Sequence, residues 1–305
     1  MSEKPSSTTR GTGPVLCNLC GVDDSEVLFE QGVAQSNRIV RCKRCGLMYA
    51  SPRSVLDLEL IDQYPEDPGF DMSKERPQLF EKQNVQVRDY ASTRKLLREL
   101  HPRRGKLVEV GSSMGLLLKS FRDEGWDVHG VEPDRNGCRY ATQTLGIQTT
   151  VATLEAARLP SGYADALVML HVIEHVPDPL GTLREIHRVL KPGGTLVLET
   201  PRYDTLMFRL LGRRERSLGC DGHIYFFTNE TLSRSCREAG FEELRHDAVG
   251  RSLTFDRLVY NVGVVSRNRW LQDRLGRVSR TLRLQNLRLH LNLRDMQRLY
   301  LRKPA

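Results

Sequence analysis

Residues 106–118, KLVEVGSSMGLLL, constrain the fold of this chain more than any other segment. An apolar run passes into a glycine-containing turn and a helical pattern, and the next apolar run ends at Glu132. A strand, a turn, a helix and a second strand ending in a carboxylate form the adenosine-holding corner of a parallel α/β sheet. An ordinary strand-turn-helix corner would show the first part of this pattern as well.

The glycine spacing in this turn argues against a dinucleotide ligand. Dinucleotide-binding turns follow G-x-G-x-x-G, because their backbone must approach a pyrophosphate closely. That pattern would place glycine at 111, 113 and 116, where the chain has Gly111, Ser113 and Leu116. We therefore expect an adenosine ligand that carries no pyrophosphate.

The remaining pattern, acid-x-Gly-x-x-x-Gly from Glu109 through Gly111 to Gly115, resembles motif I of class I S-adenosylmethionine (SAM) methyltransferases. Residues 151–179 and 190–201 resemble later segments of that family, in the same order. The resemblance spans about residues 90–250 and implies an α/β, Rossmann-like class I methyltransferase sheet with strand order 3-2-1-4-5-7-6. It also implies SAM as the cofactor.

The resemblance assigns SAM contacts to individual residues. Glu132 takes the position whose carboxylate accepts hydrogen bonds from the ribose hydroxyls, and Thr153 and Leu154 form a turn against the adenine. His171, after the fourth strand, belongs to the cofactor wall. The implied SAM-binding residues are Glu109, Gly111, Ser112, Ser113, Gly115, Glu132, Pro133, Thr153, Leu154 and His171.

Hydrophobic patterns predict the other elements. Strands are expected at 126–131, 166–170, 195–198, 241–249 and 296–302, and helices at 54–63, 78–100, 116–124 and 229–239. A chain of 305 residues can hold one substantial domain and a small one. We expect a disordered tail at 1–14, a zinc ribbon at 15–52, a linker with covering helices at 53–104, a SAM-binding domain at 105–250, a basic helical insertion or lid at 251–292 and a final strand at 293–305.

Two Cys-x-x-Cys-Gly knuckles support the ribbon, with Cys17 and Cys20 in the first and Cys42 and Cys45 in the second. Two knuckles supply the four thiolates that a structural zinc ion prefers, and they leave no position open for a substrate water. A ribbon of this size needs its metal to fold. Similar ribbons precede some sugar and natural-product methyltransferases, so we expect this one to dock against the SAM-binding domain.

The formal charge of +8 is concentrated near the C-terminus. Residues 251–305 hold thirteen Lys or Arg and three acidic residues, and residues 271–282 read as an amphipathic helix rich in arginine. A lid or dimer helix with a solvated flank would have this composition. The alternative is contact with a phosphate-bearing or lipid-linked acceptor, an acidic carrier or an anionic membrane surface. Nucleic acid has weaker support, because few aromatic residues accompany the arginines.

Methyl transfer from SAM requires alignment of the acceptor and removal of its proton. We expect His223 to be the general base, since it follows the fifth strand at the edge where acceptors approach. Its position resembles the histidine of Glu-His-x-x-x-Phe stretches in sugar C-methyltransferases with a zinc ribbon, although Gly222 replaces the glutamate. Glu174 and His175 are further candidates, either for catalysis or for bracing a helix against the sheet.

The segment HVIEHV at 171–176 also raises the question of a second metal. In some magnesium-dependent quinone and RNA-end methyltransferases the corresponding pattern is Glu-x-x-Glu-His with a distant histidine. Here His171 takes the first position, which weakens a site for a hard ion that prefers oxygen ligands. A catalytic metal is therefore not predicted, and we expect His171, Glu174 and His175 to share one face of a helix.

Three functions agree with the sequence. The leading one is methyl transfer from SAM to oxygen or carbon of a small molecule, such as a sugar, a glycolipid intermediate or a natural product. The second is an RNA or protein methyltransferase guided by the ribbon and the basic helix, and the third a non-catalytic SAM-binding interaction protein. The polar N-terminus and the lack of a long apolar run predict a cytoplasmic protein, with contact to the inner membrane face as one role for the basic helix.

Overall fold

The computed structural model describes residues 15–52, 84, 87–215, 217–220, 222–266, 269–282, 284 and 287–305. The predicted tail at 1–14 and the predicted helix at 54–63 lie outside the described residues, as do the first residues of the predicted helix at 78–100. The rest of that helix is present as helical residues at 87–89 and as α3, Ala91–Leu100.

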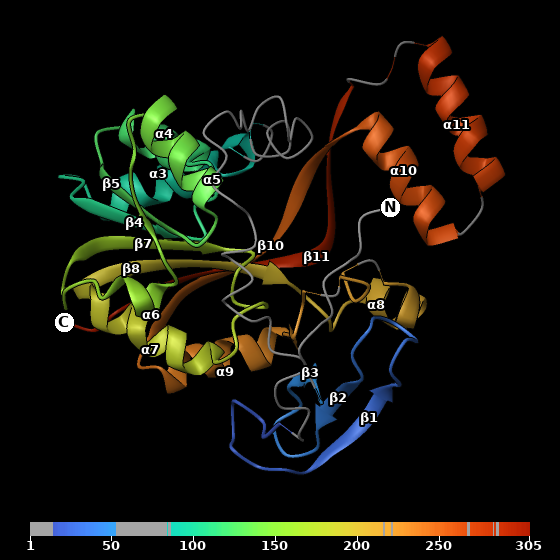
Figure 1. Ribbon diagram of the computed structural model, residues 1–305, viewed down its shortest axis with the longest axis horizontal. Coiled ribbons are helices and arrows are strands. Elements are labelled where there is room, and N and C mark those ends of the chain that lie inside the picture. Colours follow the sequence, from blue (N-terminus) through green and yellow to red (C-terminus); the bar gives the residue numbers. More distant parts are fainter. Residues whose placement is uncertain are drawn as a thin grey trace, which may run out of the picture.

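A seven-stranded sheet runs through the middle of the molecule (Figure 1). Read from β6 to β10 and numbered along the chain, its strands follow the order 3-2-1-4-5-7-6, so the predicted order is confirmed. Five neighbouring strands are parallel, and β11 pairs antiparallel with both β8 and β10. The strands are β4 (Lys106–Val110), β5 (Asp127–Glu132), β6 (Gln148–Val151), β7 (Ala164–Leu170), β8 (Leu190–Pro201), β10 (Glu242–Thr254) and β11 (Arg288–Arg302).

Helices cover both faces of this sheet, because successive strand residues point to opposite faces. On β4, Leu107 packs into a cluster with α3 and α4, whereas Val108 belongs to the cluster that contains α7 and α9. Figure 1 shows α3, α4 and α5 above the sheet and α6, α7 and α9 below it. These helices are α4 (Leu116–Arg122), α5 (Arg135–Arg139), α6 (Leu154–Ala157), α7 (Pro179–Val189) and α9 (Asn229–Glu238).

The loop after β7 differs from the sequence prediction. The helix expected to align His171, Glu174 and His175 is absent, and residues 171–178 form bends and turns. His171 has a left-handed φ of +58°, and α7 begins only at Pro179. Pro177 disfavours a helical residue before it, and Asp178 caps α7 instead. The prediction of a shared helix face is therefore wrong, and the three side chains belong to one loop at the carboxyl edge of the sheet.

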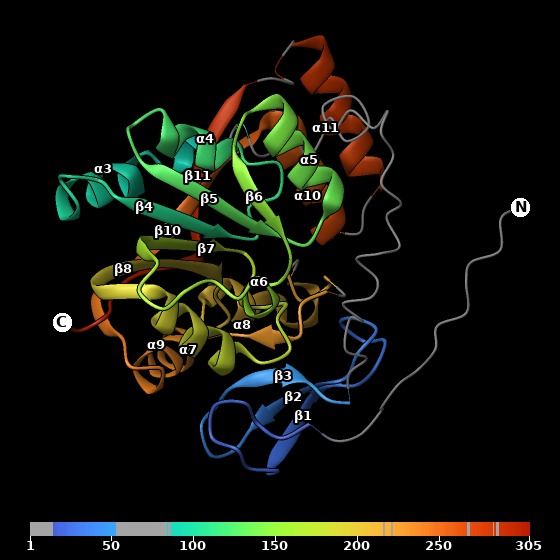
Figure 2. The same ribbon diagram turned by 60° about the vertical axis from the view of Figure 1, so that its left-hand side comes forward.

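The N-terminal ribbon forms a second sheet together with a strand of the main domain. β1 (Ser25–Phe29), β2 (Ile39–Cys42) and β3 (Met48–Ala50) are antiparallel, and β3 also pairs with β9 (Tyr225–Phe226). This ladder joins the ribbon to the segment that follows His223. Figure 2 shows the ribbon on the side of the molecule that carries α7 and α9.

The basic insertion is a two-stranded extension that carries two helices, and we call residues 251–292 the arm. β10 and β11 continue beyond the rest of the sheet and end at α10 (Phe255–Ser266) and α11 (Arg269–Thr281) (Figure 1). β11 begins at Arg288, earlier than the predicted 296. The apolar run at 296–302 marks only the half of β11 that is buried against β8.

None of the helices in the described part of the chain is long and apolar enough to cross a membrane.

Candidate functional site

The turn between β4 and α4 has the backbone that the glycine pattern predicts. Gly111 and Gly115 both have a φ of +74°, a left-handed conformation that favours glycine. A Cβ on Gly111 would lie 2.3 Å from Val172 Cγ2, so this position also needs a residue without a side chain. The turn therefore passes close under the loop that follows β7.

Glu132 fixes the far side of the same turn. Its Oε2 accepts a hydrogen bond from the Ser113 backbone N–H at 2.7 Å, and its Oε1 accepts one from the Asp134 N–H at 2.8 Å. Burial raises the pKa of Glu132, and these two hydrogen bonds oppose the rise. Each carboxylate oxygen keeps a further lone pair, as a site for ribose hydroxyls requires.

Unpartnered polar atoms lie in the space between these elements. Glu109 Oε2 and Ser112 Oγ are buried and have no hydrogen-bond partner among the described residues. Burial raises the pKa of Glu109 well above its ordinary value, and the nearby Glu132 adds to the rise. Both residues line a cavity of about 80 Å³ together with Tyr90 and His171. Since buried polar groups are normally paired, these atoms fit a polar ligand such as SAM.

The predicted adenine turn follows β6. Thr153 caps α6 by accepting a hydrogen bond from the Ala156 N–H at 3.3 Å, and Leu154 is buried. Pro133, half-buried, follows Glu132 at the end of β5. Each of these residues lies beyond the carboxyl end of a parallel strand, the edge at which such sheets bind ligands.

We expect the change Glu132→Ala to weaken SAM binding about 10- to 100-fold, because hydrogen bonds to a charged group contribute about 1.5–3 kcal/mol each. Isothermal titration calorimetry with SAM measures this affinity. Asp127→Ala, at the exposed start of the same strand, serves as the control and should bind like the wild type. Equal affinity for the two variants would contradict the assignment of Glu132.

A buried charged network lies behind the SAM cavity. The His171 ring places Nε2 3.2 Å from Glu199 Oε1 and Nδ1 3.7 Å from Glu174 Oε1. Burial alone would lower the pKa of His171, but these two carboxylates raise it to about 9. The imidazole is therefore a cation at neutral pH, held between two anions.

Sequence reasoning missed the residues that complete this network. Arg298 is 2% exposed, and its Nε donates to Glu199 Oε2 at 2.6 Å. The Tyr90 hydroxyl donates to the other oxygen of Glu199 at 3.1 Å. Burial would raise the pKa of Glu199, but Arg298 and His171 lower it to about 2. The sequence did carry a signal for this ion pair, namely a charged residue inside an apolar strand run at 199 and at 298. Such a charge is buried only when it is paired.

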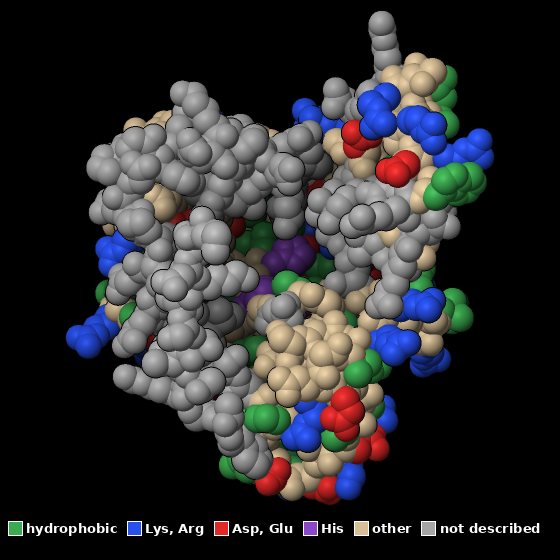
Figure 3. Space-filling view, turned by 45° about the vertical axis from the view of Figure 1, so that its right-hand side comes forward, with side chains coloured by type: hydrophobic (Ala, Val, Ile, Leu, Met, Phe, Trp, Pro, Cys, Tyr) green, Lys and Arg blue, Asp and Glu red, His purple; other side chains and the backbone are tan. Residues whose placement is uncertain are grey.

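The three predicted catalytic residues meet beside this network. The ligand atoms of Glu174, His175 and His223 all lie within 4.8 Å of one another. Glu174 Oε1 is buried and has no hydrogen-bond partner within the described residues, and His223 Nε2 lies 4.0 Å from it. The His175 and His223 rings meet edge to face, 4.7 Å between centroids. Figure 3 shows histidine side chains on the floor of a hollow in the molecular surface.

Hydrogen bonds orient both imidazoles. His175 Nδ1 lies 2.7 Å from the Gly222 carbonyl oxygen, so Nδ1 carries the proton and Nε2 is an acceptor. A Cβ at position 222 would lie 3.1 Å from that Nδ1, so a larger residue there would require the imidazole to shift by a few tenths of an ångström. Burial lowers the pKa of His223 to about 4, so this ring is neutral at physiological pH.

The spacing of these groups suits an acceptor oxygen. A hydroxyl oxygen makes hydrogen bonds of about 2.5–3.0 Å, so it can reach Glu174 Oε1 and His223 Nε2, 4.0 Å apart, at an ordinary angle. The three side chains also form a group that could hold a metal ion.

The four knuckle cysteines fit a metal. Their sulfur atoms all lie within 4.8 Å of one another. Cys17 Sγ is 3.4 Å from Cys45 Sγ, and Cys20 Sγ is 3.5 Å from Cys42 Sγ. Four thiolates held at about 2.3 Å from one zinc ion would be about 3.8 Å apart in a tetrahedron. The cluster is thus compatible with the predicted zinc ribbon.

The chain is similar in sequence to ubiquinone biosynthesis O-methyltransferases over about half of its length. A ubiquinone biosynthesis O-methyltransferase from Azoarcus sp. (strain BH72) is 28% identical over 179 residues, which cover 50% of this chain and 76% of the relative. One from Psychrobacter arcticus is 26% identical over 159 residues, covering 48% of this chain and 61% of the relative.

Among solved structures, the complex of the Haloferax volcanii Trm112 methyltransferase activator with a methyltransferase has a TM-score of 0.53. It is 15% identical and covers 74% of this chain and 93% of that one, a likeness that shows the fold. The family model described as a methyltransferase domain matches residues 80–246, more than half of the chain. The chain therefore belongs to the methyltransferase domain family and is a SAM-dependent methyltransferase.

Proposed function

We propose that this enzyme transfers the methyl group of SAM to an oxygen of a small molecule, such as a sugar, a glycolipid intermediate or a natural product. The observation that carries the proposal is the cluster of Glu174, His175 and His223, whose ligand atoms lie within 4.8 Å of one another. Glu174 also contacts His171, which lines the cavity beside Glu109. The relatives named ubiquinone biosynthesis O-methyltransferases favour oxygen over carbon. Carbon beside a carbonyl is the second acceptor that a neutral imidazole base would serve.

The chemistry follows from the protonation states of the three side chains. SAM carries its own leaving group, so the protein aligns the acceptor and removes one proton. We assign proton removal to His223, whose neutral ring places Nε2 4.0 Å from Glu174 Oε1. The charge of that carboxylate favours the imidazolium that forms, while the Tyr203 hydroxyl lies 3.4 Å from Nδ1 on the other side of the ring. His175 Nε2 is an acceptor that can hold the hydroxyl of the substrate.

We further infer that the ribbon binds one structural zinc ion through Cys17, Cys20, Cys42 and Cys45. In this role the metal fixes the two knuckles, and the ribbon in turn supports the His223 segment from the other side. Two contacts support the inference. The Ala50 N–H donates to the Ile224 carbonyl at 2.9 Å, and Gln35 Nε2 donates to the His223 carbonyl at 3.3 Å. The ribbon would then form one wall of the acceptor site.

Transfer of labelled methyl from SAM to fractionated cell extract tests the proposed function. We expect the label in the soluble metabolite or lipid fraction, and we expect much less of it with the Glu132→Ala enzyme when SAM is below saturation. Alkaline hydrolysis releases the label from a methyl ester, and hot hydriodic acid releases it from a methyl ether but not from a methylated carbon. Label found solely in RNA or protein would overturn the proposal.

A macromolecular acceptor is the second candidate, because the arm concentrates basic charge. The arm contains nine arginines and two aspartates, whereas residues 1–250 have slightly more acidic than basic side chains. Binding to nucleic acid would weaken steeply with salt, since each neutralised phosphate releases a counterion. Methylation of RNA with such a salt dependence would favour this candidate.

A further inference from the structure

One face of the arm combines exposed apolar side chains with arginine. Trp270 is 61% exposed, Val278 49% and Leu282 60%. Arg274 and Arg277 are also exposed on α11, and the Arg274 guanidinium lies 4.8 Å from the centre of the Trp270 ring. We call these five residues the arm face. Large apolar side chains gathered at one end of a soluble domain mark a contact surface.

The packing of the arm turns this face away from the protein. α11 is attached to α10 through Ser279, which is fully buried and donates to Asp256 Oδ1 at 2.6 Å. Trp270, Arg274 and Arg277 are spaced i, i+4 and i+7, so they share a side of α11 opposite Ser279. Figure 1 shows both helices at the outer end of β10 and β11, and Figure 3 shows basic and hydrophobic side chains together there.

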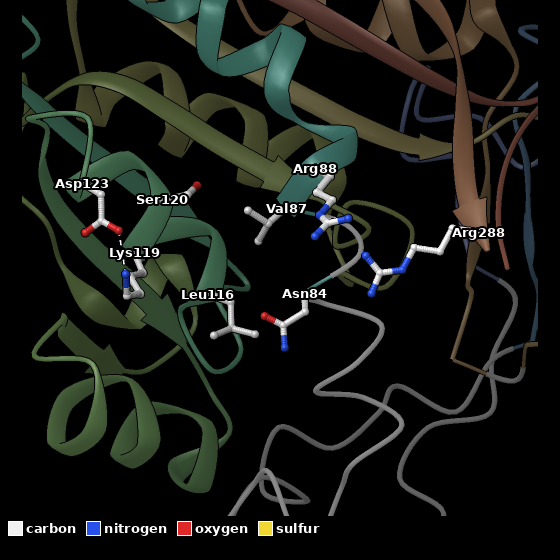
Figure 4. Close-up of a pocket in the computed structure, with 8 residues that line it drawn as sticks. All are labelled: Asn84, Val87, Arg88, Leu116, Lys119, Ser120, Asp123 and Arg288. Carbon is white, nitrogen blue, oxygen red and sulfur yellow. Dashed lines mark hydrogen bonds and ion pairs between the residues drawn. The ribbon is translucent and has the colours of Figure 1, made fainter. Parts of the chain in front are cut away.

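The position of the arm connects its face with the active site. Arg288, at the base of the arm, lines a cavity of about 730 Å³ between α4 and β11. Figure 4 shows the guanidinium groups of Arg88 and Arg288 near each other, across this space from Lys119 of α4 and from Asp123. Val87 lines both this cavity and the one beside Glu109 and His171. The space at the base of the arm therefore adjoins the SAM cavity.

We propose that the arm face docks on an anionic bilayer surface. Its aromatic and aliphatic side chains suit the boundary between head groups and acyl chains, while its arginines suit lipid phosphates. Charge complementarity selects this occupant, because the excess of positive charge in the chain is confined to the C-terminal region that contains the arm. A nucleic acid backbone would use the arginines but would leave Val278 and Leu282 exposed to water. The proposal does not depend on the identity of the acceptor.

Intrinsic fluorescence tests this docking directly, because the chain has two tryptophans in different environments. Trp126 is 3% exposed in the core and Trp270 is 61% exposed on the arm face. Vesicles that contain phosphatidylglycerol should shift the emission to shorter wavelength and sediment the full-length protein. Vesicles of phosphatidylcholine alone should do neither at physiological salt. Trp270→Phe should lose the shift.

Matched arginine variants separate the arm face from general basicity. The triple variant R274Q/R277Q/R280Q removes the two arginines of the arm face and the exposed Arg280 of the next turn. It should bind the anionic vesicles at least about tenfold more weakly, since each arginine near such a surface contributes about 1 kcal/mol, or about fivefold in affinity, to binding. The control R44Q/R103Q/R184Q removes three exposed arginines elsewhere and should bind nearly like the wild type. Circular dichroism checks that both variants are folded.

Three outcomes would overturn the proposal. The first is an absence of vesicle binding by the wild type, and the second is an equal loss in both triple variants. The third is that the wild type does not bind the vesicles but binds RNA, or self-associates in sedimentation equilibrium, and that R274Q/R277Q/R280Q loses this activity. No acceptor or methyl transfer enters these measurements, so failure of the proposed reaction would leave the result unaffected.

Discussion

The change Cys42→Ser should abolish methyl transfer while leaving SAM affinity close to that of the wild type. A domain of this size gains its stability from the metal, with about 10–16 kcal/mol of apparent binding free energy in small zinc domains. A lost ligand should therefore unfold the ribbon, although the seven-stranded sheet that holds SAM does not contain it.

The ribbon reaches the proposed catalytic residues through its backbone. β3 pairs with β9 at Met48 and Phe226 and at Tyr49 and Tyr225. The N–H groups of Ile224 and Tyr225 in turn donate to the Glu174 carbonyl at 2.9 and 3.1 Å. Loss of the ribbon would release one side of the segment that carries His223, and the reacting groups would lose their alignment.

Zinc content, SAM affinity and methyl transfer, each measured on the same three proteins, test this prediction. Elemental analysis should find one zinc per chain in the wild type and in Cys220→Ser, an exposed cysteine outside the knuckles, and less in Cys42→Ser. Calorimetry should give similar SAM affinity for all three proteins, and only Cys42→Ser should lose transfer. A zinc-free variant with normal turnover would show that the ribbon has no part in catalysis.

Most of the fold was predictable because its signals are local. Apolar strand runs, the glycines at 111 and 115 and the carboxylate at 132 each reflect a constraint on a few neighbouring residues. The doubled cysteine knuckle is a constraint of the same kind. The strand order was predicted from resemblance to a family, because hydrophobic periodicity does not indicate which strands are neighbours in a sheet.

What escaped prediction depends on contacts between distant segments. The pairing of Glu199 with Arg298 joins β8 to β11, nearly a hundred residues apart in the chain. The loop after β7 shows the spacing of a helix, but Pro177 and the cap at Asp178 override that spacing. The pattern at 271–282 predicts an amphipathic helix, and its apolar side chains Val278 and Leu282 are exposed. The sequence shows that such residues are apolar, but it does not show whether another part of the protein buries them.

The change His223→Ala should lower the rate of methyl transfer about 10²- to 10⁴-fold, the usual contribution of a positioned general base. SAM affinity should stay unchanged, because His223 does not line the cavity beside Glu109. His175→Ala should lose less, since its ring only holds the acceptor oxygen in this assignment. Added imidazole should restore part of the rate to His223→Ala and none to His175→Ala.

The pH profile gives the same assignment an independent check. Burial lowers the pKa of His223 to about 4, so its ring accepts a proton throughout the neutral range and loses this capacity as the pH falls through that value. We therefore expect kcat/KM for the wild type to be flat near neutrality and to fall only in acid, as a stopped assay over short times would measure. The contrary outcome is a loss of activity on adding a chelator while zinc stays in the ribbon, followed by recovery on adding a divalent ion. That result would make Glu174, His175 and His223 metal ligands and would contradict the assignment of His223 as the general base.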